Sequence, residues 1–595
     1  MISIPPPAIV ENYVHTGNTD FDGFYDNVRN IMTQNIRHCQ MAKGYRSPDT
    51  DNLWLRDHVY QMQGFKYWEE DMTSLVEFFL RDQTASGSLN DLECPGGRIG
   101  TESDVEYWGV LGAFTAWQAT GNDAWLESVR ENLEQALHYS TTDKYRWDKT
   151  HGLVKRPFTI DTWDFQWGDG SPEINDNTRF GIMSGDNSGL YLAARFLGQH
   201  ALAQSIKTKA NALLWNNARG YYRSFFHLEP PTPPVDINED AMLSFSNILN
   251  VNRGDFVDQK KAERIIQEYI RRGKWYSINP DYGDGKFGTA AQKSGEYVNG
   301  GIFPFIGGEL AKAELTRGYE NEGVKELKKY IELLKKDNNK TYLWYWPDGK
   351  PGIYQDTIPT DGWGSSAFLS AFIEGLVGIR DLDRAFNVVE LAPRWPAAGI
   401  SHADVRIGYG AGDAYIAYTY TVEKNTIKME VEGSGSTVRA HILLPEETES
   451  YQIHVNGQPR PYTTSRVRES RYADFSFSLP KTASITPRAI TPFAFDDDKF
   501  HPLLRAAGRQ EVFYITDEGT KMHIQNEQAF AVAGFDFKQV WIVSPDRLDS
   551  IETDSQTFDP ALAKPKATRN ILLILGIILL FCYAIFTRIP RKTVG

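Results

Sequence analysis

Cysteine is scarce in this chain. Only Cys39, Cys94 and Cys582 occur among its 595 residues, which allows at most one disulfide and argues against a metal cluster held by thiolates. Positive charge is also in deficit, because 63 lysines and arginines stand against 77 aspartates and glutamates, a formal net charge of -14. Phosphate binding needs a basic surface, so this balance disfavours nucleic acid as a partner.

Several short catalytic motifs are absent from the sequence. It contains no G-x-x-x-x-G-K-[ST] phosphate loop, no G-x-S-x-G nucleophile elbow and no H-E-x-x-H zinc helix. Its 12 histidines show no metal-ligand spacing. We therefore expect neither a metal nor an organic cofactor, and acidic residues near tryptophans remain as the main polar chemistry.

The sequence has one long apolar run, close to its C-terminus. Residues 571–587 read ILLILGIILLFCYAIFT, at the lower end of the roughly 17–25 residues that a membrane-spanning helix needs. Basic residues flank it on both sides, so we predict a transmembrane helix over 570–588 that anchors the chain in a lipid bilayer, with the face of the catalytic domain undecided. The first residues show no basic segment followed by an apolar one, and we predict no signal peptide.

Helical periodicity extends over residues 20–385. An example with a 3.6-residue period is Leu202, Ile206, Ala210 and Leu213. We expect about ten to twelve helical segments here, separated by loops rich in Gly, Pro, Asp and Trp. Long loops on a helical scaffold are typical places for binding chemistry.

After this region apolar residues recur at every second position, which indicates strands. Ile427, Met429 and Val431 alternate with charged residues, and such short strands over 386–500 predict an antiparallel β-sandwich. Residues 508–552 contain a Gly-Thr-Lys-x-x-Ile stretch at 519–524, Gly-Phe-Asp-Phe at 534–537 and Val-x-x-Val-Ser at 540–544. With these motifs they resemble a short β-rich repeat of bacterial cell-envelope proteins. The following stretch, 553–568, has the composition of a linker.

An arginine and an aspartate follow a tryptophan near the start of the chain. Trp54, Arg56 and Asp57 put a forked donor beside an acceptor, an arrangement that suits the neighbouring hydroxyls of a sugar. The chain holds 15 Trp, 29 Tyr and 32 Phe, and aromatic faces stack on the apolar faces of sugar rings. A loop salt bridge is the alternative interpretation.

A second segment encloses two carboxylates between indole rings. Asp161, Trp163, Asp164 and Trp167 follow one another closely. Aromatic surroundings lower the local dielectric constant and raise the pKa of a carboxyl group, as a general acid near neutral pH requires. A helix-capping aspartate is the alternative interpretation.

Three further segments place acids or amides at predicted helix starts. Glu102 precedes an apolar helix, Glu296 and Asn299 precede a Gly-rich helix entry, and Asp361 with Trp363 opens the last apolar helix. Each could bind a sugar hydroxyl. Each could equally be a helix cap or an acid placed to suit the helix dipole.

Taken in order, these five segments resemble the six-hairpin glycosidases, the group that includes glucoamylases, glycogen-debranching enzymes and disaccharide phosphorylases. Trp54–His58 is similar to the Trp-x-Arg-Asp segment that holds the terminal sugar. Residues 161–164 resemble the Asp-Leu-Trp-Glu segment of glucoamylases, where the acid after Trp donates the proton. Tyr297–Pro304 is similar to their Tyr-x-Asn-Gly-Gly-Ile-Trp-Pro helix entry, and 362–379 to their last barrel helix. The likeness covers about residues 20–490.

The resemblance implies a fold class and a function. The fold class is mainly α with β: an (α/α)6 toroid over 20–385, then the antiparallel sandwich, the small module and the transmembrane helix. The function is hydrolysis of α-linked oligo- or polysaccharide with inversion, with Asp164 as the general acid. The substrate-binding set would be Arg56, Asp57, Trp54, Glu102, Asp161, Trp163, Trp167, Asn299 and Trp363.

The catalytic base departs from the family pattern. An inverting enzyme needs a second carboxylate, about 6.5–9.5 Å from the acid, to activate water. Glucoamylases carry a Glu well before the final helix, but the corresponding loop here has none. Asp361 and Glu296 are the candidates in its place, followed by Asp348 and Asp356.

Two other functions fit the same residues. An inverting disaccharide phosphorylase needs no base, because phosphate attacks directly, but it needs cations near the acid; Arg56, Arg156 and Arg179 lie in suitable loops. A membrane-bound glycan-binding protein would use the same barrel without turnover. The sugar, its linkage and the oligomeric state are not determined by the sequence.

Overall fold

The computed structural model describes most of the chain. The described residues are 12–39, 42–93, 103–157, 178–230, 237–273, 281–284, 293–446, 450–479, 503–506, 509–516, 520–535, 540–543, 548–549 and 551–560. Those up to residue 479 belong to one compact unit and those from residue 503 to another.

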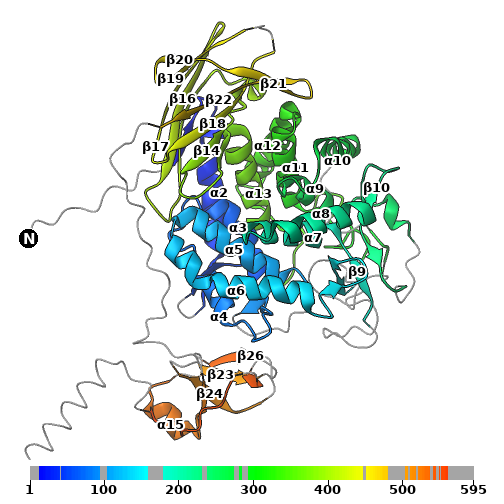
Figure 1. Ribbon diagram of the computed structural model, residues 1–595, viewed down its shortest axis with the longest axis vertical. Helices are drawn as coiled ribbons and strands as arrows, with labels where there is room; N and C mark the ends of the chain where they lie inside the picture. Colours follow the sequence, from blue (N-terminus) through cyan, green and yellow to red (C-terminus); the bar gives the residue numbers. More distant parts are fainter. Residues whose placement is uncertain are drawn as a thin grey trace, which may run out of the picture. The chain divides into compact units, whose positions relative to one another are not determined.

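Six helices of the first unit form a closed ring. Each packs against the next, and the last returns to the first (Figure 1). The ring helices are α3 (Leu55–Phe65), α5 (Val105–Thr120), α7 (Ser184–Phe196), α9 (Ser246–Asn252), α11 (Pro304–Thr316) and α13 (Gly362–Ser370). Neighbouring ring helices pack closely, since a Cβ on Gly308 of α11 would lie only 2.5 Å from the Cβ of Ala367 on α13. All nine residues of α13 are buried, as expected for a helix with neighbours on every side.

A second layer of helices covers the ring. It comprises α2 (Phe24–Met32), α4 (Ser74–Arg81), α6 (Asp123–Thr142), α8 (His200–Leu214), α10 (Gln259–Arg272) and α12 (Glu320–Lys336). These helices are amphipathic: α10 buries only Ala262, Ile265, Ile266 and Tyr269. Periodicity therefore marks the outer helices more clearly than the ring helices, which are apolar on most sides.

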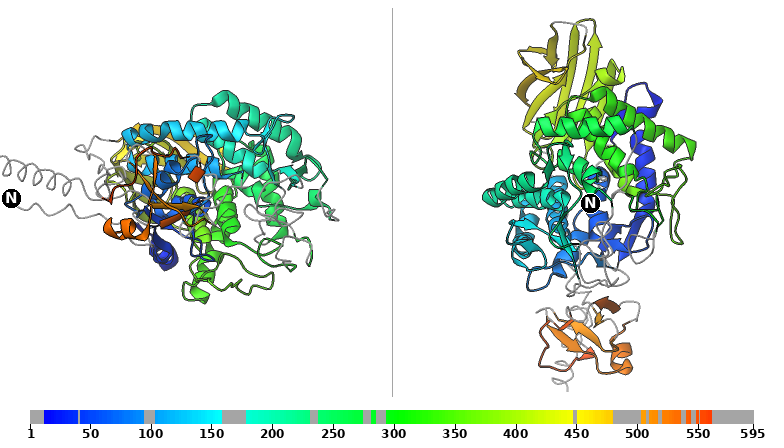
Figure 2. Two further views of the ribbon diagram at one scale, coloured as in Figure 1. Left: turned by 90° about the horizontal axis from the view of Figure 1, so that it is seen from below. Right: turned by 90° about the vertical axis from the view of Figure 1, so that its right-hand side faces the viewer.

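A β-sandwich follows the helices. One sheet has the order β1-β15-β16-β17-β19-β20 and the other β13-β14-β18-β22-β21, and both lie beside one end of the ring (Figures 1 and 2). The strands are β1 (Tyr13–His15), β13 (Ile379–Asp381), β14 (Val388–Leu391), β15 (His402–Gly408), β16 (Tyr415–Glu423), β17 (Thr426–Gly433), β18 (Thr437–Leu443), β19 (Gln452–Val455), β20 (Gln458–Arg460), β21 (Thr463–Val467) and β22 (Ser470–Ser478). The early strand β1 pairs with β15, so this domain also takes residues from before the helices.

The ring and the sandwich share a buried joint. Gly378 has φ +75° and ends the segment after α13; a Cβ there would lie 2.1 Å from the carbonyl carbon of Ala392. The Trp395 indole donates to the Tyr418 hydroxyl at 2.9 Å, and that hydroxyl donates to the Val377 carbonyl at 2.7 Å. Glycine is required at this crossing because the backbone is left-handed and its neighbours are close.

The second unit is a four-stranded sheet with one helix. The strand order is β25-β24-β23-β26. The elements are β23 (Leu503–Ala506), β24 (Val512–Ile515), β25 (Lys521–His523), α15 (Glu527–Val532) and β26 (Val540–Val543). Tyr514, Phe530 and Phe558 belong to its core.

The predicted fold class was wrong in three respects. The content is mixed α/β, because short strands connect the helices: β2 (Ile36–Cys39), β3 (Ala42–Tyr45), β4 (Leu53–Trp54), β5 (Leu92–Glu93), β6 (Trp147–Asp148), β7 (Leu153–Val154), β8 (Arg156–Pro157), β9 (Phe180–Ile182), β10 (Trp215–Asn216), β11 (Tyr221–Tyr222) and β12 (Phe226–His227). The sandwich is not purely antiparallel, since β14 pairs with β18 and β17 with β19 in parallel.

The third correction concerns the transmembrane helix. Among the described residues, no helix is both long and apolar enough to cross a bilayer. The apolar α5 has only 16 residues, and α6 has 20 but carries charges along its length, whereas a span needs roughly 20 mostly apolar residues. The predicted segment 570–588 lies outside the described residues.

Candidate functional site

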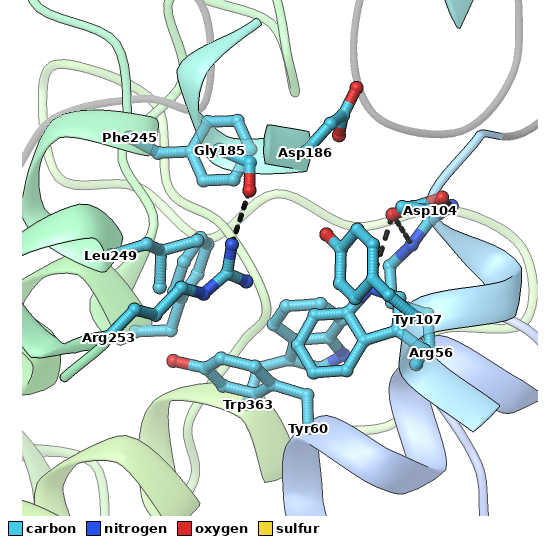
Figure 3. Close-up of a pocket in the computed structure, with 12 residues that line it drawn as sticks. Arg56, Tyr60, Asp104, Tyr107, Gly185, Asp186, Phe245, Leu249, Arg253 and Trp363 are labelled. Atoms are coloured by element: carbon cyan, nitrogen blue, oxygen red, sulfur yellow. Dashed lines mark hydrogen bonds and ion pairs between the residues drawn. The ribbon is translucent and has the colours of Figure 1, made fainter. Parts of the chain in front are cut away.

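All six ring helices contribute to one small cavity (Figure 3). Its lining residues are Arg56, Tyr60, Asp104, Tyr107, Trp108, Gly185, Asp186, Phe245, Leu249, Arg253, Phe305 and Trp363. Most of them stand at or near helix N-termini, where backbone N–H groups favour negative charge. The cavity volume is about 20 Å³, which is room for ordered water.

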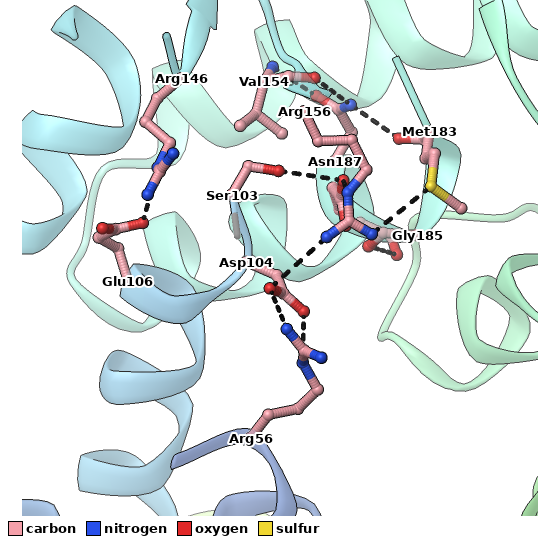
Figure 4. Close-up of polar contacts among 12 residues, drawn as sticks. Arg56, Ser103, Asp104, Glu106, Arg146, Val154, Arg156, Met183, Gly185 and Asn187 are labelled. Atoms are coloured by element: carbon pink, nitrogen blue, oxygen red, sulfur yellow. Dashed lines mark hydrogen bonds and ion pairs between the residues drawn. The ribbon is translucent and has the colours of Figure 1, made fainter. Parts of the chain in front are cut away.

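Buried arginines and aspartates alternate in a row at one wall of the cavity. Arg56, Asp104 and Asp186 line the cavity, and Figure 4 shows Arg156 beside Asp104. Arg56 donates two hydrogen bonds of 2.8 Å to the carboxylate of Asp104. Arg156 lies 3.7 Å from Asp104 and 3.3 Å from Asp186. This row of ion pairs links the starts of α3, α5 and α7. A forked contact between an arginine and a carboxylate fixes the geometry of both partners.

The two carboxylates of this wall differ electrostatically. Burial opposes ionisation of Asp104, but the guanidinium groups of Arg56 and Arg156 outweigh it and the pKa of Asp104 is lowered. Burial raises the pKa of Asp186, which lies farther from its arginine. Asp186 therefore holds a proton more readily than Asp104 does.

Stacked aromatic rings form another wall. The rings of Tyr60 and Trp363 are stacked, with centroids 4.2 Å apart and planes at 16°. Phe305 packs edge-on against Tyr60 at 5.6 Å, and the Tyr60 hydroxyl donates to Glu309 at 2.6 Å. These contacts hold the pair as a rigid aromatic platform.

Three predicted site residues meet here. Arg56 and Trp363 line the cavity. Asp57 lies behind them and accepts a 2.8 Å hydrogen bond from the indole of Trp363. Burial raises the pKa of Asp57 to about 6. Trp54 is half-buried and donates to the Thr50 hydroxyl at 3.1 Å, away from the lining.

Asp361 serves as the N-cap of α13. It is fully buried and accepts hydrogen bonds from the backbone N–H groups of Trp363 at 3.0 Å and Gly364 at 3.1 Å. Burial raises its pKa to about 8. Its oxygens are thus directed into the helix, and it does not line the cavity; its assignment as a base stays a prediction.

Glu296 and Asn299 hold the loop before α11. Glu296 accepts from the backbone N–H of Lys293 at 2.9 Å. The buried Asn299 amide accepts from the backbone of Tyr282 at 2.8 Å and donates to the Gly283 carbonyl at 3.1 Å. Neither residue lines the cavity, and their predicted roles remain untested.

The remaining predicted residues lie outside the described residues. They are Glu102, Asp161, Trp163, Asp164 and Trp167. The assignment of Asp164 as general acid is therefore still a prediction.

Sequence reasoning missed three charged residues that line the cavity. Asp186 and Arg253 belong to no motif that was singled out, and Asp104 is not among the predicted site residues. A usable signal exists in 184–189, SGDNSG, where a carboxylate sits among small residues at the start of a buried helix. Such a sequence indicates close packing around a polar group.

Comparison with known proteins identifies the fold. No family model matches the chain, and no curated protein matches its sequence. A GH78 family rhamnosidase of Bacillus sp. GL1 is similar in structure, with a TM-score of 0.51 and 15% identity over 76% of this chain and 44% of that one. This chain thus matches less than half of that protein's length.

Two other solved structures have lower TM-scores. The α-L-rhamnosidase from Dictyoglumus thermophilum gives 0.49 at 13% identity, over 79% of this chain and 50% of that one. The GH63 mannosylglycerate hydrolase from Thermus thermophilus has a TM-score of 0.41 at 14% identity. The match covers 59% of this chain and 99% of that one. The likeness to the GH78 structure shows the fold alone, and it agrees with the helical ring and β-sandwich that the motif resemblance implied.

Proposed function

We propose that the protein is a glycoside hydrolase whose sugar site has the ring cavity as its floor. The observation that carries this proposal is the convergence of six helices on one cavity, where arginine-held carboxylates face the Tyr60–Trp363 platform. The fold shared with the GH78 rhamnosidase supports it. We further propose an α-linked substrate and an inverting mechanism, as the motif resemblance implies.

In this mechanism a carboxylic acid protonates the leaving oxygen while a carboxylate removes a proton from water. The water oxygen bonds to the anomeric carbon, the glycosidic bond breaks, and the product has the opposite anomeric configuration. Asp164 is the proposed acid. The base must be a carboxylate that can reach water in the cavity.

Asp186 is the best-placed base among the described carboxylates. Asp104 is held by two bonds from Arg56 and its pKa is lowered, which makes it a weak base. Asp361 directs its oxygens to backbone N–H groups. Asp186 lines the cavity, is held more loosely by Arg156 at 3.3 Å, and has a raised pKa, so it accepts a proton more readily.

The test is hydrolysis of a panel of α-linked di- and trisaccharides and aryl α-glycosides, with the product anomer followed by proton NMR. We expect the inverted anomer first, and a fall in rate of roughly 10²–10⁴-fold in both Asp164→Asn and Asp186→Asn. The exposed Asp123 pairs with Arg384 on the surface, and Asp123→Asn is the matched control. Full activity in Asp186→Asn would remove that residue as the base, and no turnover of any substrate would refute the function.

Phosphorolysis is the second candidate, because Arg56 lines the cavity and Arg156 lies 3.7 Å from Asp104, which also lines it. A phosphorylase would cleave the same panel only when inorganic phosphate is present. Each reaction is therefore run with and without phosphate.

A further inference from the structure

One arginine that lines the cavity differs in its partners from the two arginines of the neighbouring wall. Arg56 and Arg156 each contact a carboxylate. Arg253, at the C-cap of α9, is buried and lines the cavity. In the part of the chain that the structure describes, no carboxylate oxygen lies within ion-pair distance of it.

Among the residues that the structure describes, the hydrogen bonds of Arg253 use one of its three nitrogens. Nη1 donates to the Gly185 carbonyl and, at 2.9 Å, to the Ser188 hydroxyl. Among the described residues no acceptor is recorded for Nε or Nη2. These two nitrogens form the edge of the guanidinium that binds a carboxylate or phosphate through two parallel hydrogen bonds.

The guanidinium is also fixed in position. It lies 5.5 Å from the ring centroid of Tyr107 and 5.6 Å from that of Trp108. Figure 3 shows it on the side of the cavity that holds Tyr60 and Tyr107. The nearby Glu309 is occupied by the Tyr60 hydroxyl at 2.6 Å and the Asn252 amide at 2.6 Å. A cation held this rigidly loses little conformational freedom when it binds an anion.

Burying a cation without a direct ion-pair partner is costly, and carbonyl and hydroxyl partners offset that cost only in part. We propose that Arg253 binds an oxyanion of the ligand, so that the cavity selects a sugar bearing a carboxylate or a phosphate ion beside the sugar. The two sources share one chemistry, a planar or tetrahedral group with at least two negatively charged oxygens. The sugar part of this inference rests on the proposed function, whereas the anion part does not.

The first experiment measures binding by titration calorimetry at pH 7 with three probes. D-glucuronate carries a carboxylate, D-glucose is its neutral counterpart, and inorganic phosphate is the free oxyanion. We expect glucuronate or phosphate to bind at least about 10-fold more tightly than glucose, since a hydrogen bond to a charged group has this magnitude. Tighter glucuronate identifies an acidic sugar, and tighter phosphate identifies the ion.

Two variants and a control assign the effect to Arg253. Arg253→Gln should weaken binding of the preferred anion roughly 10- to 100-fold and leave the affinity for glucose unchanged. Arg253→Lys keeps the charge but not the forked pair of donors, and it should retain part of the affinity for the anion. Arg130→Gln removes a cation from an exposed pair with Glu127 and should change nothing. Circular dichroism shows whether each variant is folded, and Arg253→Lys keeps the comparison informative if Arg253→Gln unfolds.

The outcomes separate this inference from the proposed function. Equal affinity for glucuronate and glucose together with no phosphate binding, or no effect of either Arg253 variant, would overturn the anion site. Anion binding that depends on Arg253, with no cleavage of acidic or neutral α-glycosides in the presence or absence of phosphate, would leave the anion site standing and refute the catalytic proposal.

Discussion

The indole nitrogen of Trp363 donates a 2.8 Å hydrogen bond to the carboxylate of Asp57, although the two residues are 306 positions apart. The bond joins the first turns of α3 and α13, where the ring closes. It also fixes the indole that stacks on Tyr60 at the cavity. The geometry of the aromatic platform therefore depends on a buried carboxylate that does not itself line the cavity.

Trp363→Phe keeps an aromatic ring but removes the donor to Asp57. We expect a loss of about 1–3 kcal/mol in the free energy of unfolding, because a buried acceptor loses its partner. Urea denaturation at pH 7 measures this loss in the free energy of unfolding. The control is Trp117→Phe, since the Trp117 indole makes a 2.8 Å bond to Asp123 at the exposed surface, and its loss should cost less than about 0.5 kcal/mol. Equal losses in the two variants would contradict the prediction.

Asp104→Asn tests the alternating wall of the cavity. The change leaves Arg56 and Arg156 without their shared buried countercharge, and we expect a loss of about 3–5 kcal/mol in unfolding free energy. The exposed pair of Arg130 and Glu127 gives the comparison: Glu127→Gln should cost at most about 1 kcal/mol. A small effect at Asp104 would mean that the wall is not held by this carboxylate.

Asp361 predicts a dependence of stability on pH. Burial raises its pKa from 3.8 to about 8, so between these values the folded protein binds more protons than the unfolded chain, and stability falls as the pH rises. Unfolding free energies of wild type and Asp361→Asn, measured from pH 5 to pH 9, should differ in slope. The wild type should decline more steeply, by at most about 1.4 kcal/mol per pH unit. Parallel curves would show that Asp361 is ionised throughout.

Glu374 predicts the opposite dependence at the joint between ring and sandwich. It contacts Lys312 at 2.7 Å and Lys66 at 3.0 Å. Burial alone would raise the pKa of Glu374, but the two lysines outweigh it and hold the pKa well below its usual range. The stabilisation is present above the ordinary carboxyl pKa and is lost as the pH falls through the lowered value.

Glu374→Gln should therefore cost about 3–5 kcal/mol at pH 7, because two lysines lose their buried partner. The difference from wild type should narrow in strongly acidic solution. Glu390→Gln breaks the more exposed pair with Arg380 and is expected to cost at most about 1 kcal/mol. A difference that stays constant with pH would refute the role of charge at this joint.

Local sequence patterns predicted much of the helical and strand content. The outer helices follow an apolar period, as in α10, because one face meets water and the other the ring. Strand alternation in Thr426–Gly433 is matched by alternating burial. The pattern could not show that Tyr13–His15 pairs with β15, because pairing partners are chosen by the folded arrangement and not by period.

The candidate site was less predictable than the fold. Arg56, Asp57 and Trp363 stood out because charged and aromatic residues are adjacent in short segments, and the structure brings them together. Asp186 and Arg253 have no such neighbours in sequence. They reach the cavity only because α7 and α9 are consecutive members of the ring.

The sequence by itself determined the periods of helix and strand, the acidic balance, and a motif order that resembles that of the six-hairpin glycosidases. These follow from short-range patterns, which a linear chain displays directly. Only the tertiary structure decided that arginines balance the charge of Asp104 and that Asp361 caps a helix. It also decided that Arg253 faces the cavity with no ion-paired carboxylate among the described residues. Those properties depend on burial and on contacts between distant segments, and ring closure creates both.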